Sequence, residues 1–204
     1  MQFEFLGCTF TVSFPFLTII TLLLLVDNNG MIVYGVVAAL IHELGHISAM
    51  MIKKCRPQRI NFRAFDINII DKNRAKRHYN DDVFILAAGP LANVIFCALL
   101  CCIFKATGHS WLLKPIYENL FIAAFNILPI ESLDGGQIFF NLLSRKLSIK
   151  TAENFTVLVS FMVLLPVAVL GFYILIVSKY NFSLLLLSCY LMGILLLKHR
   201  EFYY

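Results

Sequence analysis

The chain has 204 residues, of which 60% are hydrophobic, and its mean hydropathy is +0.81. Ordinary soluble domains contain about 45–50% apolar residues, so this composition excludes a soluble globular protein and indicates an integral membrane protein. The net charge of +5 is explained by orientation in a bilayer and by attraction to anionic lipid head groups, so we expect no binding of nucleic acid.

Several apolar stretches are long enough to cross a hydrocarbon core of about 30 Å as helices. They cover residues 9–26, 31–52, 83–104, 111–130, 155–177 and 182–197. The predicted fold class is an all-α polytopic membrane protein with about six transmembrane helices. Basic loops stay cytoplasmic, and with the N-terminus inside only Lys105, Lys114 and Lys179 fall on the outer side. Both termini are therefore predicted to be cytoplasmic.

Residues 2–12 alternate apolar and polar side chains around Gly7. This alternation predicts a short strand or hairpin at the membrane surface. The polar turn at residues 27–30 then makes the first two predicted spans an antiparallel helical pair.

The second predicted span contains three ionisable residues in an apolar run, His42, Glu43 and His46. Residues i and i+4 lie on the same face of a helix, so the two imidazoles can hold one metal ion. Glu43, between them, can reach a water bound to that metal. The spacing is that of a zinc hydrolase.

The loop at residues 53–82 is the longest polar stretch. Apolar residues alternate at positions 60, 62 and 64, and the pattern then slips by one to positions 65, 67 and 69. We predict two short strands, or one strand with a bulge, as a second surface β element. An edge strand here could pair with an unwound substrate; a solvated loop that fixes the topology is the alternative.

Two further segments carry helix-breaking or polar residues at membrane depth. Gly89-Pro90-Leu91-Ala92-Asn93 opens the third span, and Asn93 is costly in lipid unless it has a partner. The fourth span is interrupted between Asn126 and Gly136, where Pro129 and the Gly135-Gly136 pair are expected to break the helix. A helical pattern resumes at residues 138–147.

Counting along the helices compares the depths of His42 and Asp134. Lys53 lies 11 residues after His42, about 16 Å of helix, and Lys146 lies 12 residues after Asp134, about 18 Å. Both groups should therefore lie at the same level, measured from the same membrane face. A carboxylate and two imidazoles at one depth can complete a metal site that leaves one position open for water.

Three motifs in this order resemble the site-2 protease family, peptidase family M50, of the small bacterial six-span kind. His42-Glu43-Leu44-Gly45-His46 matches the family's HExxH element, Gly89 to Asn93 its GPxxN element, and Asn126 to Gly135 its NxxP and LDG element. The resemblance implies an intramembrane zinc metalloprotease that cleaves peptide bonds within or near transmembrane segments.

The resemblance also implies roles for individual residues. His42, His46 and Asp134 would bind one Zn²⁺ per chain, Glu43 would be the catalytic base, and Asn126 would lie in the catalytic site. The candidate substrate-binding residues are Asn93, Pro129 and Gly135. Family members often have proline two residues before the ligand Asp, whereas this chain has Ser132. The substrate-facing wall should differ accordingly.

The expected partners are a transmembrane protein or peptide substrate, the lipid bilayer and a regulatory membrane protein. We expect residues 1–204 to form a single metalloprotease domain without a PDZ or CBS domain, in a bacterial cell membrane. A divalent-metal transporter is an alternative, because His and Asp in spans also mark ion pathways. That reading predicts internal repeats, which the sequence lacks. A catalytically silent scaffold is the third reading, and the presence of Glu43 argues against it.

Overall fold

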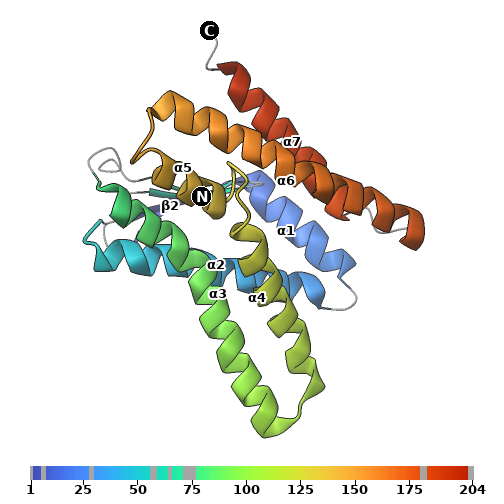
Figure 1. Cartoon of the computed structure of the whole chain (residues 1–204). Helices are drawn as coiled ribbons and strands as arrows, with labels where there is room; N and C mark the ends of the chain where they lie inside the picture. The colour runs from blue at the N-terminus through green and yellow to red at the C-terminus, as the bar shows by residue number, and fades with distance from the viewer. Residues whose placement is uncertain are drawn as a thin grey trace. The chain divides into compact units, whose positions relative to one another are not determined.

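The computed structural model describes residues 2–5, 8–27, 30–55, 59–63, 66–70, 77–179 and 183–201. Within these ranges the chain is mostly helical with one small sheet (Figure 1), which confirms the predicted helical class with short β elements. The chain divides into two compact units, residues 1–125 and 126–204, and each has its own packing. The prediction of a single domain stays a prediction.

Among the described residues, three helices are long and apolar enough to cross a membrane. They are α2 (Met31–Ile52), α3 (Tyr79–Thr107) and α6 (Ile149–Ser178). The apolar parts of α1 (Phe14–Val26), α4 (Leu113–Asn126) and α7 (Ser183–Glu201) are shorter than the roughly 20 residues that a span needs. A short 3-10 helix, η2 (Ser110–Leu112), precedes α4. The count of six spans therefore stays a prediction.

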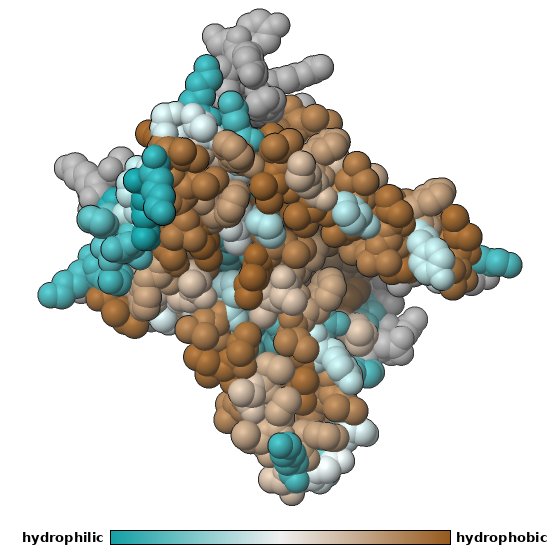
Figure 2. All heavy atoms as spheres, viewed as in Figure 1, coloured by the Kyte–Doolittle hydropathy of each residue, from teal (hydrophilic) through white to brown (hydrophobic). Residues whose placement is uncertain are grey.

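Apolar side chains cover much of the surface seen in Figure 2. Leu99 of α3 and Phe172 and Ile176 of α6 are each more than half exposed. A soluble monomer rarely exposes apolar surface on this scale, whereas a bilayer covers it without cost. The protein is a membrane protein.

The first unit contains a four-stranded sheet of β1 (Gln2–Phe5), β2 (Cys8–Val12), β3 (Arg59–Arg63) and β4 (Asp66–Ile70), in that spatial order. β1 pairs with β2 and β3 with β4 in antiparallel fashion, which confirms strands in both predicted segments. β2 and β3 pair in parallel, with Phe10 opposite Ile60. This long-range pairing was not predicted, because alternation marks a strand and does not identify its partner.

Helices α2 and α3 pack closely at two glycines. A Cβ on Gly45 would collide with the carbonyl oxygen of Ala88 and would lie 2.7 Å from the Cβ of Ala92. Gly89 of α3 faces the histidines of α2 in the same way. Small residues at such crossings let two backbones approach closely, and helix interfaces in lipid are enriched in them.

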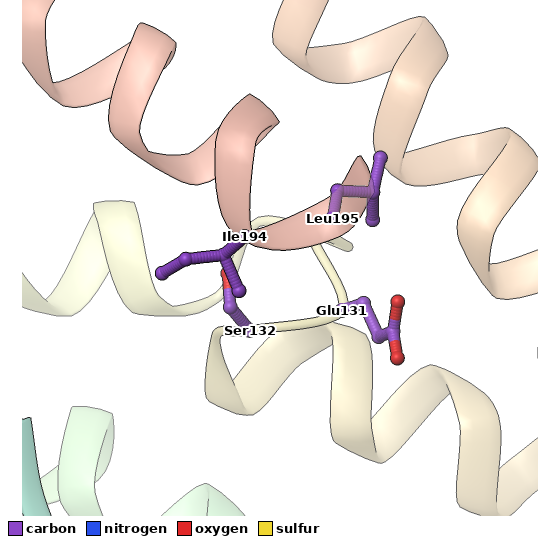
Figure 3. Close-up of a pocket in the computed structure, with 4 residues that line it drawn as sticks. All are labelled: Glu131, Ser132, Ile194 and Leu195. Atoms are coloured by element: carbon purple, nitrogen blue, oxygen red, sulfur yellow. The ribbon is translucent and has the colours of Figure 1, made fainter. Parts of the chain in front are cut away.

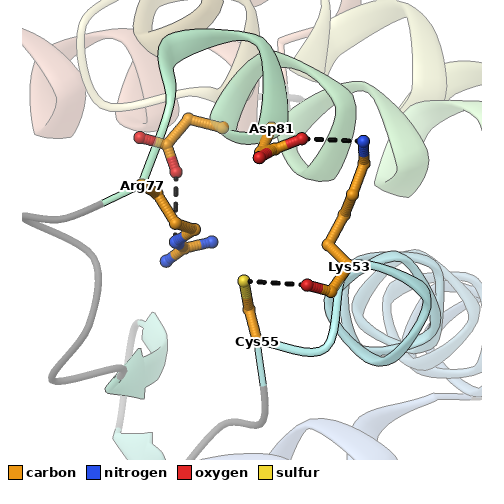
Figure 4. Close-up of polar contacts among 5 residues, drawn as sticks. Lys53, Cys55, Arg77 and Asp81 are labelled. Carbon is orange, nitrogen blue, oxygen red and sulfur yellow. Dashed lines mark hydrogen bonds and ion pairs between the residues drawn. The ribbon is translucent and has the colours of Figure 1, made fainter.

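Charged residues join the C-terminal end of α2 to the N-terminal end of α3 (Figure 4). Lys53 Nζ lies 2.7 Å from Asp81 Oδ1 and 5.1 Å from the centre of the Phe84 ring. Arg77 Nε pairs with Asp82 Oδ1 at 3.4 Å. The C-terminal end of α2 therefore lies beside the N-terminal end of α3.

In the second unit, the segment between α4 and α5 (Asp134–Leu143) is irregular, as predicted from Pro129. The prediction that Gly135 and Gly136 also break the helix is wrong, because both lie in the first turn of α5. A Cβ on either would collide with a backbone carbonyl, that of Ile127 or of Ile130. The glycine pair thus lets the irregular segment pack against α5.

Helix α6 holds this irregular segment through Ser160, whose side chain is fully buried. The Glu131 backbone N–H donates to Ser160 Oγ at 2.8 Å, and Ser160 Oγ lies 2.6 Å from the Thr156 carbonyl oxygen. Glu131 and Ser132 also line a small pocket with Ile194 and Leu195 of α7 (Figure 3).

We expect Ser160→Ala to loosen the segment at residues 127–133. The substitution removes the hydroxyl oxygen that accepts from the partly buried Glu131 N–H, and a hydrogen bond of this kind contributes about 0.5–1.5 kcal/mol. Amide exchange at Glu131 should therefore accelerate by about 2-fold to 10-fold. Ser188→Ala is the matched control, because the buried Ser188 hydroxyl bonds to the Leu185 carbonyl of its own helix. Equal exchange at Glu131 in both variants would contradict this role of Ser160.

Candidate metal centre

His42 and His46 lie one turn apart on α2, and both are buried, with 5% and 8% of their surface exposed. Their Nε2 atoms are 3.2 Å apart. The two rings meet edge to face, with centroids 4.8 Å apart and planes at 85°. The predicted convergence of two imidazoles on one helix face is therefore present.

Each ring is held by a contact at its other nitrogen, Nδ1. His46 Nδ1 lies 2.8 Å from the backbone oxygen of Ile85, which can only accept a hydrogen bond. His46 therefore carries its proton on Nδ1, and its Nε2 presents a lone pair. A ligand histidine commonly has such a partner, which sets the ring orientation and the tautomer.

The corresponding partner of His42 is Asn93 of α3, whose Oδ1 lies 2.9 Å from His42 Nδ1. Asn93 Nδ2 donates to the carbonyl oxygen of Ala38 at 2.8 Å. A carbonyl oxygen cannot donate, so the Asn93 nitrogen must face Ala38 and the Asn93 oxygen must face His42. His42 therefore also donates from Nδ1 and presents a lone pair at Nε2.

The two facing Nε2 atoms test whether these residues suit a metal ion. Two lone pairs 3.2 Å apart repel each other unless a cation lies between or beside them. Neutral imidazole nitrogen is a preferred ligand of Zn²⁺. The donor chemistry of the pair therefore fits the implied zinc ion.

Gly89 of α3 provides the space that the two rings occupy. A Cβ at this position would lie 2.5 Å from His46 Nε2 and 2.8 Å from His42 Nε2. Real Cβ atoms do not make contacts this short. Two residues of the GPxxN segment thus contribute to the site. Gly89 leaves room for both rings, and Asn93 orients the ring of His42.

The other predicted site residues lie at the ends of helices or beside the histidines. Glu43 is half-buried between the two histidines on α2. Asn126 is the last residue of α4, and Asp134 is the first residue of α5; both are half-buried. A carboxylate in the first helical turn is stabilised by the helix dipole.

The predicted substrate-binding residues differ in accessibility. Asn93 is fully buried, and its side chain bonds to other parts of the protein. Gly135 is buried under the Ile127 carbonyl, and Pro129 is half-buried in the irregular segment. Their contacts with a substrate stay predictions. The predicted need of Asn93 for a partner is confirmed.

Two polar residues of the structure were missed in the sequence. Asn119 of α4 is fully buried and accepts from Asn93 Nδ2 at 2.9 Å. Ser160 of α6 holds the segment that leads to α5. Both lie in apolar runs, and a polar side chain at membrane depth is the signal that could have identified them.

Known proteins resemble this chain in sequence and in fold. Residues 108–167 match the model of peptidase family M50. Stage IV sporulation protein FB of Bacillus subtilis (strain 168) is 31% identical over 144 residues, which cover 69% of this chain and 50% of that protein. The chain therefore spans about half the length of this curated relative.

A solved structure shares the fold. The site-2 protease from Methanocaldococcus jannaschii superposes with a TM-score of 0.64 at 20% identity, over 94% of this chain and 91% of that chain. The family-model match includes the segment from Asn126 to Asp134, which carries one of the three motifs. In its motifs, its paired histidines and these matches, the chain is similar to the site-2 protease family, peptidase family M50.

Proposed function

We propose that this protein is an intramembrane zinc metalloprotease that hydrolyses peptide bonds within or near transmembrane segments of other membrane proteins. The observation that carries the proposal is the 3.2 Å distance between the Nε2 atoms of two buried histidines. They lie on a helix that is long and apolar enough to cross a membrane, with Glu43 between them in the sequence. Both tautomers are set for metal binding by acceptors at Nδ1. The match to the peptidase family M50 model and the similarity to Stage IV sporulation protein FB support the same activity.

The proposed ligands of one Zn²⁺ per chain are His42, His46 and Asp134. Each offers one ligand atom, an imidazole nitrogen or a carboxylate oxygen, and this donor set is typical of catalytic zinc with one position left open. The matching depths of His42 and Asp134, counted along the chain, support the inclusion of Asp134.

In the proposed mechanism Glu43 acts as general base and then as general acid. When bound, zinc supplies Lewis acidity, which makes water a nucleophile near neutral pH and polarises a carbonyl group. Glu43 takes the proton of the attacking water and transfers it to the leaving nitrogen as the peptide bond breaks. Asn126 is proposed to donate a hydrogen bond to the carbonyl oxygen as negative charge develops there.

The proposed substrate is a transmembrane protein or peptide, which must unwind before its amide is accessible. The proposed substrate contacts are Pro129 in the segment before α5, Gly135 in the first turn of α5, and Asn93 on α3. The proposal includes six spans with both termini in the cytoplasm, a single domain, a bacterial cell membrane and control by a regulatory membrane protein. The bias of Lys and Arg toward the inner loops supports this topology.

We expect purified protein to contain close to one zinc per chain and Asp134→Ala to lose most of it. Removing one of three protein ligands leaves two imidazoles, which hold the ion too weakly to survive purification. Elemental analysis after size-exclusion chromatography in detergent measures the ratio. Chelation should also abolish cleavage in the wild type, and added Zn²⁺ should restore it.

Asp81→Ala is the matched control for this experiment, since it removes a carboxylate that pairs with Lys53 at the end of α2. Its zinc content should equal that of the wild type. Well-folded wild-type protein without bound zinc, and with cleavage insensitive to chelation, would refute the metalloprotease proposal. A zinc content in Asp134→Ala equal to that of the wild type would refute only the assignment of Asp134 as the third ligand.

A further inference from the structure

Asn119 lies outside every motif of the sequence, yet it is fully buried on α4. Its Oδ1 accepts from Asn93 Nδ2 at 2.9 Å, and its Nδ2 donates to the Pro115 carbonyl oxygen at 2.8 Å. A buried amide in an apolar helix is costly unless its hydrogen bonds are made. Here one bond lies within its own helix and the other reaches the residue that contacts His42.

The direction of these hydrogen bonds is fixed at both ends. The Pro115 oxygen can only accept, so the Asn119 nitrogen faces Pro115 and the Asn119 oxygen faces Asn93. The Asn93 nitrogen therefore has two acceptors, Asn119 Oδ1 and the Ala38 oxygen. Each of its two protons has one partner.

Rotation of the Asn93 amide by half a turn would reverse this arrangement. Its oxygen would then face two acceptors, and its nitrogen would face His42 Nδ1. His42 would have to accept there and carry its proton on Nε2, the atom that binds the metal in the proposed function. The orientation of the Asn93 amide therefore determines which nitrogen of His42 can act as a ligand.

We propose that Asn119 is a positioning residue for metal binding, which acts through Asn93 to keep His42 in the tautomer with its proton on Nδ1. Without Asn119, the Ala38 carbonyl alone holds the Asn93 amide, and one N–H loses its partner. Only the expected effect of Asn119 on zinc affinity rests on the proposed function. The effect on the His42 tautomer is a property of the metal-free protein.

The test compares Asn119→Leu with Asn119→Asp. Leucine removes the acceptor, whereas the carboxyl group of aspartate retains an oxygen that can accept from Asn93 in either protonation state. Cys97→Ala is the matched control, because Cys97 Sγ also bonds from α3 to α4, at the Ile116 oxygen. If Asn119→Leu does not fold, Asn119→Ala replaces it.

Two measurements are made on each variant. Nitrogen NMR of ¹⁵N-histidine-labelled, metal-free protein reports the tautomer of His42, and competition with a zinc-binding dye reports zinc affinity. We expect the Nδ1–H tautomer in the wild type, in Asn119→Asp and in Cys97→Ala. Asn119→Leu should show a mixture of tautomers and a zinc affinity lower by about 10-fold to 100-fold, the usual effect of losing a partner of a ligand histidine.

The outcomes separate this proposal from the proposed function. An unchanged tautomer and unchanged zinc affinity in Asn119→Leu would overturn the role of Asn119, whatever the protein cleaves. Equal losses in Asn119→Leu and Cys97→Ala would reduce the effect to helix packing and would overturn it as well. Failure of the wild type to bind zinc would refute the metalloprotease proposal, while the tautomer measurement would still decide the role of Asn119.

Discussion

Glu43→Gln should lower the rate of peptide cleavage by about 10²-fold to 10⁴-fold while the protein keeps its zinc. A glutamine has the same shape but cannot take the proton of the attacking water, and a positioned general base contributes about this factor. The histidines and their Nδ1 contacts are untouched by the change. Cleavage is measured on a single-span peptide that the wild type hydrolyses, and zinc by elemental analysis.

Glu153→Gln is the matched control, because it makes the same change on a half-buried residue of α6. Its cleavage rate and zinc content should both equal those of the wild type. Cleavage that survives in Glu43→Gln with zinc in place would show that another group acts as the base. Loss of zinc in Glu43→Gln would instead show that Glu43 helps to hold the metal.

Gly89→Ala should remove zinc from the protein almost completely, although it adds one methyl group. The new Cβ would lie 2.5 Å from His46 Nε2 and 2.8 Å from His42 Nε2, so at least one ring must leave its position. Loss of an outer contact costs about 10-fold to 100-fold in metal affinity, and displacement of a ligand itself should cost about 100-fold or more. Zinc affinity in detergent, measured by dye competition, tests this.

Gly193→Ala serves as the control for the general effect of alanine in a helix. A Cβ at Gly193 of α7 meets nothing within 4 Å, so the variant should be as stable as the wild type or more stable by up to about 1 kcal/mol. Normal zinc affinity in Gly89→Ala would mean that α2 and α3 can separate enough to admit the methyl group. The close crossing would then not be needed for metal binding.

The sequence predicted the features of the site that depend on spacing along one helix. The separation of four residues between His42 and His46 places their rings together on α2, and no distant contact is needed for that inference. Asn93 was expected to need a partner because a polar group in lipid is costly. That cost does not identify the partner. The partners of Asn93 are His42, which lies 51 positions away in the sequence, and Asn119, which lies 26 positions away.

The wrong prediction at Gly135 and Gly136 has a clear physical cause. Glycine disfavours a helix by about 1 kcal/mol relative to alanine, so a pair of glycines after Pro129 suggests a break. In the structure the carbonyls of Ile127 and Ile130 pack where side chains would lie on α5. Tertiary contact of this kind overrides local preference. The pairing of β2 with β3 escaped prediction for the same reason, since it too depends on distant segments.

The two histidines differ in how readily evolution or an engineer can adjust them. His46 is oriented by a backbone oxygen, and any residue at position 85 other than one that distorts α3 still supplies that oxygen. His42 is oriented by the side chain of Asn93, which a single codon change can replace. A side-chain substitution at position 85 therefore leaves the acceptor of His46 in place, whereas a substitution of Asn93 removes the acceptor of His42. Differences in metal affinity among related chains should arise at the His42 side.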